Sequence, residues 1–201
     1  MQQAQKTAEL LLDAKVNTVI SSSKLGSIET AKAISQVQEA ADCLGADCVP
    51  RYVEMKQLED LNVENILKQS DKGVKGLPLQ SGWLNIYEDE VITELWDQSE
   101  KAWKYLLNEL ASESGQGNCV VAVGHPAVLI AMMGHCLNLT KGWLGAFHLD
   151  AGSICVVDFP DGPSGRGIVR CINYTAHLGR WSIPITRTTL DDEDFVYTDD
   201  P

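Results

Sequence analysis

The sequence predicts an α/β sandwich in which mostly parallel strands form a central sheet. Helical and strand-like patterns alternate from Gln3 to Tyr174, which is typical of a parallel sheet covered by helices. The run Cys119–Val123 is continuously apolar, as in a strand with both faces buried. With 201 residues, the chain is long enough for one such domain with a sizeable core.

The first half of the chain is predicted to contain two helices and two strands. Apolar side chains recur at helical spacing over residues 3–14 and again from Ile28 to Ala40. Between these helices, residues 16–20 are a predicted strand that ends in three serines. Shorter segments complete this half: a candidate strand over residues 48–53, a partly helical pattern over 57–69 and loop signals over 70–87.

The second half begins with the longest predicted helix, over residues 88–110. Its tryptophans, Trp96 and Trp103, are expected to pack in the core. A more apolar helix is expected from Pro126 to Cys136. The other predicted segments are a turn over residues 112–118, a loop over 139–150, a strand over 153–159, a turn over 160–167 and its hairpin partner over 168–174.

His125 is the candidate functional residue that the local pattern indicates. It follows the predicted strand and precedes Pro126, which suits the first position of a helix. Ligands bind at the carboxyl edge of parallel sheets, and the amides at a helix N-terminus favour anions. An anion site at His125 and a histidine that merely caps a buried helix are both compatible with this pattern.

The charge balance argues against some partners. The formal net charge is −12, which disfavours nucleic acid and an anionic membrane surface. Part of this charge lies in residues 186–201, which we expect to be a flexible acidic tail after a single domain over residues 1–185. No apolar run reaches membrane-spanning length, and the first residues show no signal-peptide pattern.

The cysteines and histidines do not indicate a metal site. The 6 cysteines form no CxxC pair, so buried reduced thiols are expected, with Cys43 and Cys48 as a weaker candidate for a redox pair. The separation of His125 and His135 does not place two metal ligands together on a helix. We therefore expect no metal.

Several sequence blocks occur in a fixed order from Gln2 to Leu178: QQAQKTAELLL, TVISSSKLGSIETAKAI, VVAVGHPAVLIAMMGHCLNL, GSICVVDF and INYTAHL. Together they resemble the histidine phosphatase (phosphoglycerate-mutase-like) superfamily. The amino-acid sequence of these blocks is most similar to the C-terminal part of plant chloroplast members of the superfamily, which act on a phosphorylated sugar acid. The resemblance implies a three-layer α/β fold, a chloroplast stromal location and a phosphorylated sugar or sugar acid as ligand.

The resemblance also implies hydrolysis of a phosphate monoester without a metal or other cofactor. In that superfamily, the histidine of an Arg-His-Gly motif attacks phosphorus. Arginines and a second histidine surround the phosphoryl oxygens, and a carboxylate protonates the leaving oxygen. Fixed cations and hydrogen-bond donors suit this reaction because the transition state carries charge on those oxygens.

Matched residue by residue, the chain retains part of this machinery. His125 matches the second histidine, and residues 21–31 match a phosphate-binding segment in which Gly26 stands where the superfamily has an arginine. Lys24 lies nearby but lacks the bidentate geometry of an arginine. The resemblance therefore implies a residual anion pocket formed by His125, Ser22, Lys24 and the amide of Ala127.

The carboxylic acid is matched with less precision. Glu90 fits best, with Asp89 and Glu88 as rivals, although an acidic first turn of a surface helix explains all three equally well. The Arg-His-Gly motif itself is absent, and no Arg-His pair occurs in the sequence. In the superfamily this motif lies on a strand before the first helix, so we expect the domain to be N-terminally truncated and to lack that strand.

Two functions therefore compete. The chain is either part of a sugar-phosphate phosphomonoesterase, itself degenerate and non-catalytic, or a regulatory or dimerisation module that binds a phosphorylated ligand without hydrolysis. The partner of such a module is an intact phosphatase module or a second copy of the chain. Gly26 favours the second hypothesis, because truncation does not explain an internal substitution. An unrelated α/β domain with reduced thiols ranks last.

Overall fold

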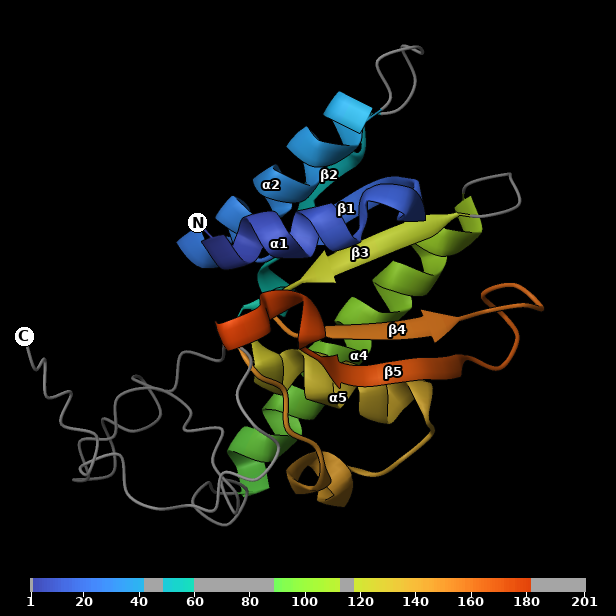
Figure 1. The fold of residues 1–201 in the computed structure, drawn as a ribbon. Helices are drawn as coiled ribbons and strands as arrows, with labels where there is room; N and C mark the ends of the chain where they lie inside the picture. The colour runs from blue at the N-terminus through green and yellow to red at the C-terminus, as the bar shows by residue number, and fades with distance from the viewer. Residues whose placement is uncertain (1, 42–48, 60–88, 113–117, 182–201) are drawn as a thin grey trace, which may run out of the picture.

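The structure of the chain, a computed structural model, describes residues 2–41, 49–59, 89–112 and 118–181. Helices and strands alternate through these residues, as predicted (Figure 1). The helices are α1 (Gln2–Leu10), α2 (Leu25–Ala41), α4 (Asp89–Ser112) and α5 (Pro126–Cys136), and the strands are β1 (Val16–Ser21), β2 (Arg51–Glu54), β3 (Cys119–Val123), β4 (Ile154–Asp158) and β5 (Ile168–Tyr174). Short 3-10 helices are η1 (Leu12–Ala14), η2 (Lys56–Leu58), η4 (Lys141–Ala146) and η5 (Ala176–Trp181).

A parallel sheet with strand order β2-β1-β3 forms the middle layer. Successive side chains of its central strand point to opposite faces. Val19 packs with Ala8 of α1 and Ile34 of α2, whereas Ile20 packs with Leu95 of α4 and with α5. Helices therefore cover both faces of the sheet, and the predicted α/β sandwich is confirmed.

The last two strands form a hairpin of their own, as the sequence predicts. β4 and β5 pair antiparallel, and their register shifts twice along the ladder. Near one shift, Asn173 adopts a positive φ of 55°, a conformation that asparagine tolerates better than most residues. Its side-chain oxygen accepts a hydrogen bond from the amide of Asp150 at 2.8 Å, which ties the hairpin to the preceding loop.

Gln38 of α2 joins three segments of backbone. Its side-chain oxygen accepts from the amide of Val16 at 3.1 Å, and its amide nitrogen donates to the carbonyls of Leu11 at 2.7 Å and Leu12 at 3.2 Å. These groups belong to the corner between α1 and β1. Gln38 is buried, so the side chain satisfies backbone groups that water does not reach.

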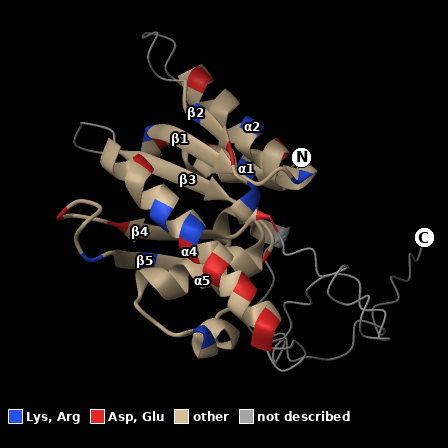
Figure 2. Cartoon of the chain, turned by 180° about the vertical axis from the view of Figure 1, so that it is seen from behind, with Lys and Arg blue, Asp and Glu red and all other residues tan. Residues whose placement is uncertain are grey.

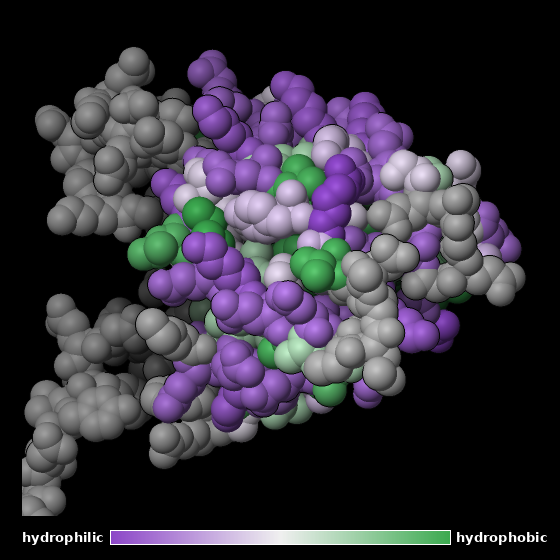
Figure 3. Space-filling view, turned by 90° about the horizontal axis from the view of Figure 1, so that it is seen from above, coloured by the Kyte–Doolittle hydropathy of each residue, from purple (hydrophilic) through white to green (hydrophobic). Residues whose placement is uncertain are grey.

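The surface is largely polar. Figure 2 shows acidic residues along the first half of α4, and the two in its first turn, Asp89 and Glu90, suit the positive end of the helix dipole. Seen from above, over α2 and β2, the surface is mostly hydrophilic with separate hydrophobic side chains (Figure 3). None of the described helices combines the length and apolarity needed to cross a bilayer.

Three elements differ from the sequence expectation. The first helix ends at Leu10, and a 3-10 turn continues to Ala14 before Lys15 adopts a left-handed conformation with φ 46°. The predicted loop over residues 139–150 contains η4. The helical pattern over residues 57–69 is described only as far as residue 59, where it is the 3-10 helix η2.

The apolar run Cys119–Val123 forms β3, but it lies at the edge of the described sheet. Each of its residues is only partly buried. The apolar sequence predicted that helices cover both faces of this strand. It did not predict whether the strand pairs with neighbours along both of its edges. The loop over residues 70–87, the tail over residues 186–201, Glu88, Cys43 and Cys48 lie outside the described residues.

Candidate functional site

Backbone hydrogen bonds join the ends of all three parallel strands at their carboxyl edge. The amide of Met55, after β2, donates to Ser21 at 2.8 Å, and the amide of Ser22, after β1, donates to Val123 at 2.9 Å. The amide of His125, after β3, donates to the carbonyl of Leu58 at 3.0 Å. The segments that contain Ser22 and His125 therefore follow neighbouring strands, as the sequence predicts.

The turn between β3 and α5 is closely packed. A Cβ atom on Gly124 would lie 2.8 Å from the carbonyl oxygen of Leu58 and 3.0 Å from its Cβ, so only glycine fits there without movement. His125 is the N-cap of α5, with extended backbone, and its Nδ1 accepts from the amide of Ala127 at 3.3 Å. Pro126 occupies the first turn, as predicted.

The capping role of His125 is confirmed, whereas the anion site stays a prediction. His125 stands at the carboxyl edge of a parallel strand, and it also caps a buried helix. The amide of Ala127, which the predicted anion pocket includes, already donates to the imidazole. An anion that bound this amide would have to compete with Nδ1 of His125.

Ser22 is the predicted site residue with the most unusual environment. The residue is 1% exposed, and its Oγ is buried with no hydrogen-bond partner among the described residues. Leaving a buried hydroxyl unsatisfied costs on the order of 1–3 kcal/mol. The neighbouring Ser21 differs, because its hydroxyl lies 2.8 Å from the phenolic oxygen of Tyr52.

The turn that leads into α2 is exposed, whereas the turn that leads into α5 is closely packed. Lys24 and Gly26 are exposed, and a Cβ atom on Gly26 would meet nothing within 4 Å. The hydroxyl of Ser23 donates to the carboxylate of Glu59. This carboxylate places a negative charge at the same edge as the predicted anion pocket and opposes anion binding there.

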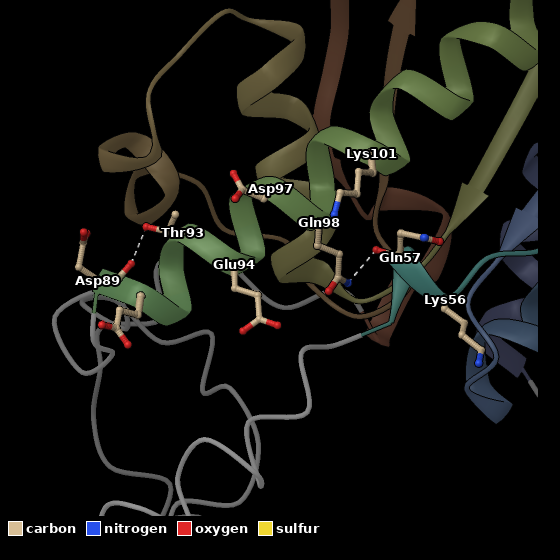
Figure 4. A pocket seen from close by; sticks show the side chains of 9 residues that line it. Lys56, Gln57, Asp89, Thr93, Glu94, Asp97, Gln98 and Lys101 are labelled. Atoms are coloured by element: carbon tan, nitrogen blue, oxygen red, sulfur yellow. Dashed lines mark hydrogen bonds between the residues drawn. The ribbon is translucent and has the colours of Figure 1, made fainter.

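Glu90 lies in a different place. It lines an open hollow of about 650 Å³ between η2 and the first half of α4, and His125 is not among the lining residues (Figure 4). Figure 4 shows the carboxylates of Asp89, Glu94 and Asp97 along the helix beside the hollow. Glu90 is exposed and belongs to the first turn of α4, together with Asp89.

Asp89, one of the two rivals of Glu90, has a partner of its own. Its carboxylate lies 2.8 Å from Nζ of Lys141, which also donates to Thr93 at 2.8 Å. This contact ties the first turn of α4 to η4. The assignment of the acid stays a prediction.

The candidate residues thus fall into two groups. Ser22, Lys24, His125 and Ala127 belong to turns at the carboxyl edge, whereas Glu90 lies beside a separate hollow. The sequence did not indicate Glu59 or Tyr52, whose side chains contact Ser23 and Ser21. Their position after or on β2, the neighbouring strand of a parallel sheet, was the available signal.

The other histidines each contact another side chain of the fold. His177 Nε2 lies 3.2 Å from the hydroxyl of Thr7, and burial lowers the pKa of His177. The ring of His135 packs against that of Trp96 in a tilted arrangement with 4.0 Å between ring centroids, and its Nε2 lies 3.1 Å from the hydroxyl of Ser99. His148 pairs with the carboxylate of Asp150 at 3.0 Å.

The described cysteines are free thiols, as predicted. Burial raises the pKa of Cys119, Cys136 and Cys155, which disfavours the thiolate. Buried protonated thiols of this kind are poor nucleophiles.

Two curated plant proteins are similar to most of this chain. It is 54% identical over 195 residues to a 2-carboxy-D-arabinitol-1-phosphatase of Triticum aestivum, covering 96% of this chain and 39% of the relative. It is also 54% identical over 185 residues to a probable 2-carboxy-D-arabinitol-1-phosphatase of Arabidopsis thaliana, covering 92% and 37%. The chain thus spans less than two fifths of the length of these relatives.

Solved structures show the same fold at low sequence identity. An alpha-ribazole phosphatase from Shigella flexneri matches with a TM-score of 0.59 at 17% identity, covering 86% of this chain and 80% of that one. A mycobacterial glucosyl-3-phosphoglycerate phosphatase matches with a TM-score of 0.60 at 15% identity, covering 87% and 84%.

The family model of the histidine phosphatase superfamily (branch 1) matches residues 1–170, which is most of the chain. This match agrees with the sequence blocks, with the relatives and with the α/β fold. The chain belongs to the histidine phosphatase superfamily.

Proposed function

We propose that this chain is part of a phosphomonoesterase that acts on a phosphorylated sugar acid, in the chloroplast stroma. The relatives named above carry this activity in their names, and their similarity extends over nearly the whole chain. The observation that carries the proposal is that His125 and the buried Ser22 follow neighbouring parallel strands at the carboxyl edge of the sheet. His125 flanks the phosphoryl group in this proposal. Glu90 is the acid that the family resemblance implies, and because it lines a separate hollow, it would have to act from outside the group of residues around His125.

The chain on its own does not turn over phosphate esters, in this proposal. The sequence holds no Arg-His pair, so the attacking histidine of the superfamily motif has no counterpart. Without that nucleophile the covalent route is lost. Gly26 also replaces an arginine, and losing one preorganised donor costs on the order of a hundredfold to a thousandfold in rate.

A phosphate-release assay tests this proposal. The purified chain is incubated with a panel of sugar and carboxy-sugar phosphates, and His125→Ala serves as the matched control. We expect equal, background-level release from both proteins. Release by the unaltered chain that His125→Ala abolishes would show that the chain is catalytic by itself.

The second candidate function is a module that binds a phosphorylated ligand without hydrolysis. The unsatisfied hydroxyl of Ser22 favours it, because a ligand oxygen would satisfy a donor that the described residues leave without a partner. An intact phosphatase module or a second copy of the chain would then be its partner. Phosphate should shift the His125 resonance in an NMR titration, and Ser22→Ala should reduce that shift. A resonance unmoved at millimolar phosphate contradicts this function.

Gly26→Arg tests whether phosphate binds near the first turn of α2, because this substitution should increase the affinity for phosphate. The open space around Gly26 admits a longer side chain, and a guanidinium makes paired charge-assisted bonds with phosphate. We expect a roughly tenfold tighter phosphate dissociation constant in the same titration. Gly26→Gln is the uncharged control. Equal affinity in both variants would place the pocket away from the first turn of α2.

A further inference from the structure

Side chains of α1 fix η5, the last described element, to the first helix. Nζ of Lys6 donates to the carbonyl of Leu178 at 3.1 Å, and the hydroxyl of Thr7 lies 3.2 Å from Nε2 of His177. Leu178 is buried, and a Cβ atom on Gly152 would lie 3.4 Å from its side chain. Figure 1 shows η5 between α1 and the end of the β4–β5 hairpin. η5 therefore connects a helix of the parallel sheet to the separate hairpin.

The imidazole of His177 lies at the centre of this contact. One of its faces stacks on the ring of Tyr174, with 5.8 Å between ring centroids and 7° between the planes. Nε2 contacts Thr7 of α1. Nδ1 is buried and has no hydrogen-bond partner among the described residues. The ring thus joins the end of β5 to the first helix with one nitrogen paired and the other unpaired.

A second proton does not fit this arrangement in either tautomer. If Nε2 carries the proton of the neutral ring, a second proton must go to Nδ1, which then becomes a buried donor without an acceptor. If Nδ1 carries it, a second proton on Nε2 displaces the hydrogen bond that the hydroxyl of Thr7 donates. An unsatisfied buried donor is costly, more so when it is charged.

The charges around His177 also disfavour the protonated ring. α1 presents the ammonium of Lys6, and β5 presents the phenol of Tyr174. In the loop before β4, the carboxylate of Asp150 is engaged by His148 and Asn173 instead. Burial and then Lys6 lower the pKa of His177, whereas the backbone of Gly152 opposes this shift without forming a hydrogen bond to Nδ1.

We propose that the contact between α1 and η5 is a pH-sensitive latch, closed while His177 is neutral and opened by its protonation. The proposal concerns the attachment of η5 and the hairpin to α1, and it does not rest on phosphate binding at His125. Opening removes the bond to Thr7 and places two cations side by side, Lys6 and the imidazolium. η5 then separates from α1, and the hairpin loses its link to the first helix.

The direction of the pH dependence follows from the lowered pKa. The unfolded chain binds this proton near the ordinary histidine pKa of about 6.5, whereas the folded chain binds it only at lower pH. Between the two pKa values the unfolded or opened state holds more protons, so the stability of the latch rises with pH. The latch therefore contributes fully above about pH 7 and weakens as the pH falls below about 6.5.

An NMR titration combined with hydrogen exchange tests the latch. The amide of Leu178 donates to the carbonyl of Thr175 at 2.9 Å, so its protection reports whether η5 is closed. The His177 ring should titrate below about pH 6.5, and the protection factor of Leu178 should be lower at pH 5.5 than at pH 7.5, by up to about tenfold for each unit of lowered pKa. Titration at or above pH 6.5, or protection that does not change while His177 titrates, would overturn the proposal.

Three variants separate His177 from the other histidines. His177→Gln should abolish the pH dependence of Leu178 protection, whereas His148→Gln, the matched control at an exposed histidine, should retain it. Lys6→Gln keeps a donor but removes the cation, so His177 should titrate at higher pH and the pH dependence should shrink. Undiminished pH dependence in His177→Gln contradicts the latch. If His177→Gln does not fold, an unchanged His177 titration in Lys6→Gln contradicts it equally.

Discussion

The turn after β3 and the turn after β1 lie at the same edge of the sheet, yet they are packed in opposite ways. The first places Gly124 against the backbone of Leu58 and fixes His125 by a cap hydrogen bond. The second exposes Lys24 and Gly26 to open space.

The residues of the β3 turn are therefore constrained by close packing, whereas Lys24 and Gly26 of the β1 turn are exposed. The β3 turn is determined by packing, so its residues are needed for folding whether or not the site binds anything. In the β1 turn, Lys24 and Gly26 have few packing contacts, so substitutions there should disturb the fold less. Substitutions in the two turns should therefore have opposite effects on stability.

The largest effect is expected for Gly124→Ala. The new Cβ would approach a backbone carbonyl to 2.8 Å, which the strand-to-helix turn cannot relieve by rotating a side chain. Overpacking of this kind costs about 1–3 kcal/mol. Urea unfolding should show a lower midpoint. An unchanged midpoint would mean that η2 moves away freely and that the β3 turn is not tightly packed.

His125→Ala should lower the free energy of unfolding by about 1 kcal/mol, because α5 loses its N-cap. His125→Asn keeps a capping acceptor and should retain most of the stability. The same pair separates capping from binding, since neither variant offers an imidazole to phosphate. Equal destabilisation by both substitutions would show that the imidazole contributes more than the cap.

Gly26→Ala should raise the free energy of unfolding, in contrast to the substitutions in the β3 turn. The position lies in the first turn of α2, has no neighbour within 4 Å of the new methyl group, and has no positive φ. Replacing glycine with alanine in a helix stabilises by up to about 1 kcal/mol. Thermal unfolding should therefore occur at a higher temperature. Destabilisation would indicate that this turn makes contacts outside the described residues.

The smallest effect is expected for Ser22→Ala. Loss of a hydroxyl with no described partner should leave the free energy of unfolding within about 0.5 kcal/mol of the original value, or raise it. Thr18→Val is the control, because Thr18 Oγ1 is buried without a described partner in the middle of β1. Both variants should be as stable as the original in chemical unfolding. A clear loss for Ser22→Ala alone would mean that its hydroxyl has a partner.

The helices and strands were largely predictable because hydrophobic period and proline position determine them locally. The strand Cys119–Val123 and the helix that starts at Pro126 have the predicted bounds. The length of the first helix was overestimated, because apolar Leu11 and Leu12 fit a helical pattern although the chain turns there.

The candidate site was less predictable because it depends on contacts between distant segments. The local sequence pattern indicated His125 and the family resemblance added Ser22, and the structure joins their turns by a hydrogen bond from the amide of Ser22 to the carbonyl of Val123. The contact of Glu59 with Ser23 was not predicted: the position of Glu59 after a neighbouring strand placed it near this edge, but the contact itself depends on the path of the chain after β2.

Gln38 has a consequence for how the sequence can vary. Its side chain must accept one hydrogen bond and donate two, to backbone groups on both sides of the α1–β1 corner. Glutamate lacks the donors, asparagine is one methylene too short, and an aliphatic side chain leaves all of these groups unsatisfied. In a saturation mutagenesis screen for folded protein, position 38 should tolerate almost no substitution, although it lies on a helix far from the candidate site.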